Sequence, residues 1–257
     1  MSSPFLDTAL DAARAAADVI RHYYQRNLEV VIKADKSPVT QADVETEKVI
    51  HKVISERFPS HGFYGEETGQ SAIDAEYLWL VDPIDGTKAF VREYPFFSTQ
   101  IALMHRGRLI LGVSSAPVYG ELAWGEIGPE GNKGAYLNDK PIRVSDLDTI
   151  EASAISGGNL KSLANSDGWG RYGKLVARAH RIRGYGDFLH YHLLAAGKID
   201  VVIESDVNIL DIAALSVIVE AAGGKFTDLQ GGPLTLETTT VLASNGKLHS
   251  AVLSALG

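Results

Sequence analysis

Apolar residues at helical spacing mark the first element of the chain. They begin just after Ser3-Pro4, a typical helix start because serine can cap the helix and proline suits its first position. The stripe consists of Leu6, Leu10, Ala13, Ala17, Ile20 and Tyr24. This pattern predicts a long first helix whose alanines allow close packing against a neighbour. Thr40 then opens a second predicted helix.

Extended apolar segments predict a sheet after the second helix. Tyr77–Val81 has the length and composition of a buried strand. Three further segments are separated by short polar turns, which is typical of an antiparallel meander. These segments are Phe97–Met104, Leu109–Ala116 and Glu121–Trp124, and a short strand is also expected at Val30–Ile32.

The second half of the chain alternates between strand-like and helical patterns. Strands are expected at Ala152–Ile155 and Ile199–Glu204, helices at Phe188–Ala196 and Ile212–Ala222, and a broken helix between Leu160 and Ala179. Such alternation predicts a second, mixed α/β layer. The Pro/Gly/Asp-rich stretch between residues 128 and 148 is the best candidate boundary. We therefore expect an N-terminal α+β half over 1–145 and a C-terminal α/β half over 146–257.

Composition narrows the classes of function. The 257 residues are 45% hydrophobic and 22% charged, which argues against disorder, and the absence of cysteine excludes disulfides, thiolate metal sites and a cysteine nucleophile. A net charge of −8 argues against nucleic-acid binding and, without bound cations, against binding a phosphorylated metabolite. No apolar run approaches the roughly 18 residues of a membrane span, and no signal peptide is evident, so we expect a cytoplasmic protein without membrane contact.

The segment Asp82-Pro83-Ile84-Asp85-Gly86-Thr87 carries the strongest chemical signal. It follows the predicted buried strand directly, and its proline and glycine favour a stiff turn. Two aspartates three positions apart on such a turn can direct their oxygens at one centre, and hard divalent cations such as Mg²⁺ favour oxygen ligands. Backbone N–H groups near Gly86 and Thr87 can bind an anion. An ordinary Asp/Pro/Gly turn that closes a strand is the alternative.

Four other acidic positions allow both a structural and a functional interpretation. Asp43 completes a capping box with Thr40, yet it can also serve as an acceptor beside a reacting water. Glu66 and Glu67 are adjacent, and either can be a solvated surface residue or reach the turn at Asp82. Asp211 lies near the start of the predicted helix at Ile212, where a carboxylate is favoured electrostatically.

Taken together, these motifs resemble the inositol monophosphatase superfamily of Mg²⁺-dependent phosphomonoesterases over nearly the whole chain. The motifs that carry the resemblance are Lys33 to Asp43, Glu66-Glu67, Asp82 to Thr87, Asp211 to Ala214 and Glu220 to Gly224. The resemblance implies an α/β fold of the alternating αβαβα layered type and a homodimer. The family usually has tryptophan immediately before the aspartate of the last motif, where this chain has Leu210.

The resemblance also implies roles for individual residues. Two or three Mg²⁺ ions would be held by Glu66, Asp82, the main-chain carbonyl of Ile84, Asp85 and Asp211. Thr87 and Asp43 would orient and deprotonate the attacking water, with Glu66 also at the catalytic centre. The backbone at Gly86 and Thr87 would bind phosphate, and Lys33 in the preceding loop would help to bind the substrate; a solvated loop lysine is the alternative.

The segment from Arg183 to Phe188 is the best indication of substrate. It resembles the histidinol-phosphate phosphatase branch of the superfamily, where an acidic residue stands in the place of Asp187. Asp187, with Glu204, Asp206 or Asn208, can bind the cationic end of histidinol phosphate by charge-assisted hydrogen bonds. In the structural alternative, Asp187 only caps the helix at Phe188.

Three functions remain open at this stage. Hydrolysis of histidinol phosphate is favoured over hydrolysis of inositol-1-phosphate or a broader range of sugar phosphates and bisphosphates. The third is a regulator that binds metal and phosphate without catalysis. An intact set of Asp43, Glu66, Asp82, Asp85, Thr87 and Asp211 argues against the third, since a binding protein needs no pair that activates water.

Overall fold

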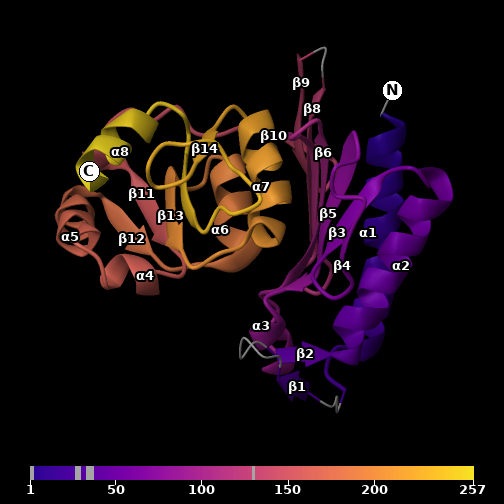
Figure 1. The fold of residues 1–257 in the computed structure, drawn as a ribbon. Coiled ribbons are helices and arrows are strands. Elements are labelled where there is room, and N and C mark those ends of the chain that lie inside the picture. The colour runs from indigo at the N-terminus through magenta and orange to yellow at the C-terminus, as the bar shows by residue number, and fades with distance from the viewer. Residues whose placement is uncertain (1–2, 27–29, 33–37, 129–130) are drawn as a thin grey trace.

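A computed structural model describes residues 3–26, 30–32, 38–128 and 131–257, and its elements form five alternating layers (Figure 1). Helices α1 and α2 cover one face of a large sheet. Helices α6 and α7 lie between that sheet and a smaller one, and α4, α5 and α8 cover the far face of the smaller sheet. The predicted αβαβα sandwich is confirmed. No helix among the described residues is long and apolar enough to cross a membrane.

The first layer forms as the apolar pattern predicts. Helix α1 (Pro4–Tyr23) begins at Ser3, whose Oγ accepts the Leu6 N–H at 3.1 Å. Its buried alanines, Ala9, Ala12, Ala13 and Ala16, bring it close to the large sheet and to α2 (Gln41–Arg57). The capping box predicted at Thr40 and Asp43 opens α2.

The large sheet has eight strands in the order β10-β9-β8-β7-β6-β5-β3-β4. Neighbours are antiparallel except β3 and β5, which run parallel, so the predicted meander is confirmed from β5 to β8 and continues through β10. The strands are β3 (Gly62–Gly65), β4 (Gly69–Ser71), β5 (Tyr77–Asp85), β6 (Ser98–His105), β7 (Arg108–Ala116), β8 (Glu121–Gly128), β9 (Gly131–Leu137) and β10 (Lys140–Ile142). A separate pair, β1 (Val30–Ile32) and β2 (Pro38–Thr40), lies near the short helix α3 (Thr87–Val91).

The smaller sheet has five strands in the order β12-β11-β13-β15-β14, with β11 parallel to both of its neighbours. Its strands are β11 (Ala154–Gly157), β12 (Arg181–Arg183), β13 (Val201–Ser205), β14 (Lys225–Thr227) and β15 (Thr240–Ser244). The helices of this half are α4 (Lys161–Ala164), α5 (Gly168–Arg178), α6 (Asp187–Ala195), α7 (Ile209–Ala221) and α8 (His249–Leu256), with a 3₁₀ turn at Ile150–Ala152.

Several boundaries differ from the sequence prediction. Helix α7 begins at Ile209, three residues before the expected start, because Asn208 caps it. The broken helix expected between Leu160 and Ala179 is two helices, α4 and α5. The strand expected from Ala152 begins at Ala154, because the 3₁₀ turn occupies Ile150–Ala152.

Helix α7 joins the two halves of the chain. A Cβ on Gly112 of β7 would lie 2.1 Å from the carbonyl oxygen of Ala214, so glycine is needed for this close approach. Residues from both sheets share one core cluster around α6 and α7. The division of the chain at residue 145 stays a prediction.

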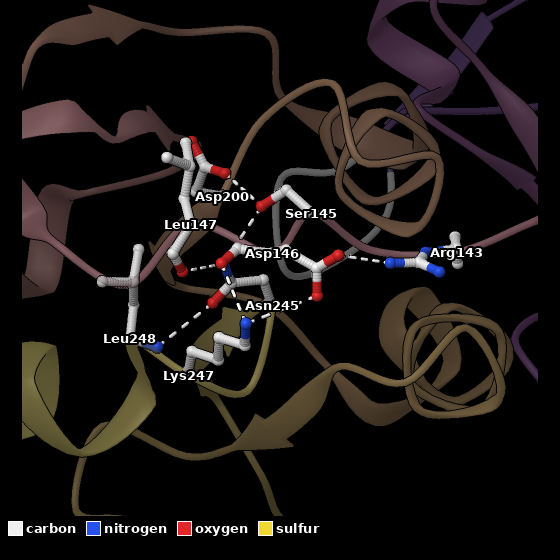
Figure 2. Close-up of polar contacts among 8 residues, drawn as sticks. All are labelled: Arg143, Ser145, Asp146, Leu147, Asp200, Asn245, Lys247 and Leu248. Carbon is white, nitrogen blue, oxygen red and sulfur yellow. Dashed lines mark hydrogen bonds and ion pairs between the residues drawn. The ribbon is translucent and has the colours of Figure 1, made fainter.

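The connection between the two sheets is fixed by polar contacts (Figure 2). The buried Asn245 side chain donates to Ser145 Oγ at 3.0 Å and to the Leu147 carbonyl at 2.7 Å, and Ser145 Oγ donates to the buried carboxylate of Asp200. These contacts attach residues 145–147 to β13 and β15.

Candidate active site

A rigid turn ends strand β5. The buried Asp82 accepts the Ile84 N–H at 2.9 Å, and the sheet register breaks between Asp82 and Asp85. Thr99 Oγ1 on the neighbouring strand donates to the Pro83 carbonyl at 2.9 Å. Gly86 has φ +93°, and a Cβ there would lie 2.7 Å from the Phe96 carbonyl oxygen. These contacts restrict the backbone of the turn and therefore fix where Asp82 and Asp85 begin.

Three carboxylates converge at this turn. Oxygens of Asp82, Asp85 and Asp211 all lie within 4.8 Å of one another, and we call these residues the acidic cluster. Asp211 comes from the first turn of α7, where it accepts the Asn208 N–H at 2.9 Å and the Asn208 side-chain N–H at 2.6 Å. Asp85 and Asp211 lie 126 residues apart in the sequence, and the fold brings them together.

The electrostatics of the acidic cluster favour a bound cation. Burial, and then the charges of Glu66 and Asp85, raise the pKa of Asp82 well above its usual value. Burial and the charge of Asp211 do the same for Asp85, and burial raises the pKa of Asp211 to about 7. The charges of Asp85 and Asp211 disfavour ionisation of Asp82, and the charge of Asp211 disfavours ionisation of Asp85, so a divalent cation with a preference for oxygen ligands would relieve the repulsion. The donor set therefore fits Mg²⁺.

Glu66 adjoins the acidic cluster at the end of β3. Its backbone N–H donates to the Val81 carbonyl on β5 at 3.2 Å, and its charge contributes to the raised pKa values of Asp82 and Asp211. The roles of Glu66 and of the Ile84 carbonyl as metal ligands stay predictions.

Asp43 serves the helix cap and also reaches the turn. Its Oδ2 accepts the N–H and the hydroxyl of Thr40 at 2.8 and 2.7 Å, while its Oδ1 accepts the Thr87 hydroxyl at 3.1 Å. The Thr87 hydroxyl also lies 3.1 Å from the Ile84 carbonyl. Burial raises the pKa of Asp43, although hydrogen bonds from Thr40 and Thr87 oppose that rise. The two interpretations of Asp43 are thus compatible.

A second acidic region lies within electrostatic reach of the acidic cluster. It consists of Asp187, at the start of α6, and Glu204, on β13, and we call these two residues the acidic pair. Burial and the charge of Glu204 raise the pKa of Asp187 to about 6. The charges of both also raise the pKa of Asp85, after burial and Asp211, so the pair lies within electrostatic reach of the turn. Gly186 holds the cap position of α6 and Asp187 is the first helical residue, so Asp187 is not the N-cap residue that the capping alternative expected.

Glu204 is buried and fully engaged by its own half of the chain. Its Oε1 accepts the Asn159 N–H at 3.0 Å, and its Oε2 accepts the Tyr191 hydroxyl at 2.8 Å and lies 3.2 Å from His190 Nε2. Burial alone would raise the pKa of Glu204, but His190 and the hydrogen bonds outweigh it and the pKa is lowered. Glu204 is therefore a fixed negative charge near neutral pH.

Other predicted residues are placed elsewhere or not described. Lys33 lies outside the described residues. Asp206 accepts the Ser162 N–H at 2.9 Å, and Asn208 caps α7, so both are committed to structural contacts. Leu210, which stands where the resemblance leads us to expect a tryptophan, is buried at the start of α7.

The sequence did not predict two residues whose side chains hydrogen-bond to the backbone of the site segments. Thr99 donates a hydrogen bond to the Pro83 carbonyl. The buried Glu47 accepts hydrogen bonds from the Glu67 and Thr68 N–H groups, next to Glu66. The available signal for Glu47 was its spacing: four residues after Asp43, it lies on the same face of α2.

Comparison with known proteins agrees with this geometry. The model of the inositol monophosphatase family matches residues 1–257. The chain is 36% identical to a histidinol-phosphatase of Mycobacterium tuberculosis, covering 100% of this chain and 99% of that protein. It is 34% identical to inositol monophosphatase 3 of Solanum lycopersicum, covering 98% and 96%. The crystal structure of the extragenic suppressor protein suhB of Bartonella henselae superposes with a TM-score of 0.87 at 32% identity, covering 99% and 98% of the two chains.

Proposed function

The chain belongs to the inositol monophosphatase family, and we propose that this member is a Mg²⁺-dependent phosphatase that hydrolyses L-histidinol phosphate to L-histidinol and phosphate. Relatives named for histidinol phosphate and for inositol phosphate are about equally similar, at 36% and 34% identity, so similarity alone does not choose between the substrates. The observation that supports histidinol phosphate is the acidic pair beside the acidic cluster.

The acidic cluster would hold the metal. Asp82, Asp85 and Asp211 supply carboxylate oxygens, with Glu66 and the Ile84 carbonyl adjoining them. When bound, Mg²⁺ neutralises the charge of the phosphate and stabilises the charge that develops on the transferring group. The single proton of the Thr87 hydroxyl can go to Asp43 Oδ1 or to the Ile84 carbonyl, and in either case the carbonyl oxygen keeps a lone pair for the metal.

Thr87 and Asp43 would prepare the attacking water. Asp43 Oδ2 is occupied by Thr40, which leaves Oδ1 directed at the Thr87 hydroxyl. A water that donates to Thr87 Oγ1 can pass a proton through that oxygen to Asp43 Oδ1. Burial raises the pKa of Asp43 and thereby makes it a better proton acceptor. The backbone N–H groups after Gly86, at the start of α3, would bind the phosphate.

The acidic pair would select the leaving group. Histidinol phosphate carries an ammonium on the carbon next to its phosphorylated CH2 group and an imidazole at the far end, whereas the corresponding part of inositol phosphate presents neutral hydroxyls. Glu204 is held ionised by its neighbours, and a cation beside Asp187 would favour the ionised form of that residue as well. Two carboxylates of this kind favour a cationic group over a hydroxyl.

A substrate panel tests the proposal. Release of phosphate from histidinol phosphate, inositol-1-phosphate and an adenosine bisphosphate is measured with Mg²⁺, and kcat/KM is compared. We expect histidinol phosphate to be favoured at least tenfold. A preference for inositol-1-phosphate would contradict the substrate while keeping the phosphatase, and no turnover of any ester would contradict both. The homodimer is also part of this proposal, and sedimentation equilibrium tests it.

A further inference from the structure

Glu47 is a fully buried carboxylate that contacts backbone instead of solvent. It lies on α2 and has 0% exposure. Its Oε2 accepts the Glu67 N–H at 2.8 Å, and its Oε1 accepts the Thr68 N–H at 2.7 Å. Both oxygens of one side chain therefore hold two successive peptide groups that lie 20 residues away in the sequence.

Gly65 makes room for this carboxylate. A Cβ at Gly65 would lie 2.5 Å from the carboxyl carbon of Glu47 and 2.6 Å from each of its oxygens, so the carboxylate lies directly against the end of β3. Since φ of Gly65 is not in the left-handed region, the glycine is needed for space and not for backbone conformation.

Backbone hydrogen bonds hold the chain at Glu66 and at the two residues that follow it. On one side, the Glu66 N–H donates to the Val81 carbonyl of β5, one residue before Asp82. On the other side, the next two N–H groups are held by Glu47. The backbone of Glu66 is therefore fixed relative to the acidic cluster by β5 and by α2 together.

We propose that Glu47 is a positioning residue for the metal site, and that it acts by fixing Glu66 through the Glu67 and Thr68 N–H groups. The inference rests on the proposed function, because it takes Glu66 as a metal ligand. Groups that orient metal ligands typically change metal affinity about 10–100-fold when they are replaced. Glu47 also lies one helical turn after Asp43, so one face of α2 would support both the metal and the attacking water.

The test measures Mg²⁺ binding to the metal-free protein by calorimetry. Glu47→Gln places an amide N–H against backbone N–H donors, so we expect the affinity for Mg²⁺ to fall about tenfold or more. Gly65→Ala should reproduce the loss, because its Cβ displaces the same carboxylate. Glu56→Gln removes the same charge from an exposed position of α2 and should bind Mg²⁺ like the wild type. An affinity within twofold of wild type in Glu47→Gln would overturn the inference.

Hydrogen exchange of the unmodified protein gives a second test, which needs no variant to fold. If the Glu47 contacts and the metal site are coupled, saturating Mg²⁺ should slow exchange of the Glu67 and Thr68 amides about tenfold. Unchanged exchange at both amides, in a protein that binds Mg²⁺, would contradict the coupling. If the wild type neither binds Mg²⁺ nor hydrolyses any ester, it is the proposed function that fails.

Discussion

The acidic cluster and Glu204 of the acidic pair lie within electrostatic reach of each other, yet the pKa values of these buried carboxylates are shifted in opposite directions. In the cluster, the charged neighbours of Asp82 and Asp85 are other carboxylates, and their pKa values are raised well above the usual range. In the pair, Glu204 is just as buried, but His190, Tyr191 and the Asn159 N–H stabilise its charge and its pKa is lowered.

This difference shows that burial alone does not decide the state of a carboxylate. The chain itself supplies the partners of Glu204, so that residue is charged and in place before any ligand binds. In the acidic cluster, Ile84 and Asn208 donate hydrogen bonds to Asp82 and Asp211, but the pKa values stay raised, so a cation would be needed to stabilise the fully ionised cluster. Substitutions in the cluster should therefore affect the reaction itself, and substitutions in the pair should affect the choice of substrate.

The largest effect is expected from Asp85→Asn. The substitution keeps the side-chain volume but removes one charge and one strong metal ligand from the acidic cluster, so kcat should fall on the order of 10³-fold. Phosphate release at saturating substrate measures this, and circular dichroism checks the fold. Asp74→Asn, at an exposed loop position, is the matched control and should retain full activity. Near-normal turnover by Asp85→Asn would rule out the metal assignment.

Thr87→Val should have the next largest effect. Valine matches the shape of threonine but cannot bridge a water to Asp43, so kcat should fall about 10²-fold, within the range for lost proton transfer. Thr87→Ser keeps the hydroxyl and should stay within a few-fold of wild type. Equal kcat values for the two variants would show that the hydroxyl has no part in the reaction.

Much of the large-sheet half could be predicted because its signals are local. The Ser3-Pro4 start of α1 and the Thr40–Asp43 capping box depend on residues within one helical turn, and both are present. The boundaries of the second half were less accurate. The periodicity of α7 is obscured because the helix is buried almost all round, so only the Asn208 cap marks its start.

The candidate site could be predicted only where charge and turn chemistry coincide. Asp82, Asp85 and Gly86 stand in one short segment, and the family motif added Asp211. The sequence around Glu47 does not indicate that its carboxylate is buried. The reason is that the N–H groups that bind it belong to Glu67 and Thr68, which are distant in the sequence. Likewise, nothing near Glu204 in the sequence indicates that Asn159 and His190 stabilise its charge.

Asp187→Asn should change the choice of substrate but not the rate of the chemical step. Loss of one charge from the acidic pair should raise KM for histidinol phosphate about 30-fold, or about 2 kcal/mol, with kcat little changed. For inositol-1-phosphate, KM should change less than twofold. Asparagine tolerates the φ of +46° found at this position, so the fold should persist. Asp167→Asn, an exposed substitution, is the control, and equal losses on both substrates would argue against the acidic pair as the selective element.

The smallest expected effect is a pH dependence of stability in the metal-free protein. The pKa of Asp211 is raised from 3.8 to about 7 in the folded state, so the folded protein holds a proton that the unfolded chain has already released. The free energy of unfolding therefore falls as pH rises through that value, by about 1 kcal/mol between pH 6 and pH 8.

Urea denaturation in EDTA at the two pH values measures this change. His61, His192 and His249 have lowered pKa values, mainly because of burial, and contribute with the opposite sign. Asp211→Asn carries the same histidines, so the difference between the two proteins reports Asp211 together with its effect on the pKa values of Asp82 and Asp85. We expect the variant to lose less stability than the wild type on going to pH 8, and Mg²⁺ to remove the same loss from the wild type, because a cation satisfies the ionised cluster. A wild type whose stability falls no more than that of Asp211→Asn would mean that the acidic cluster is not destabilised by its own charge, and its contrast with Glu204 would disappear.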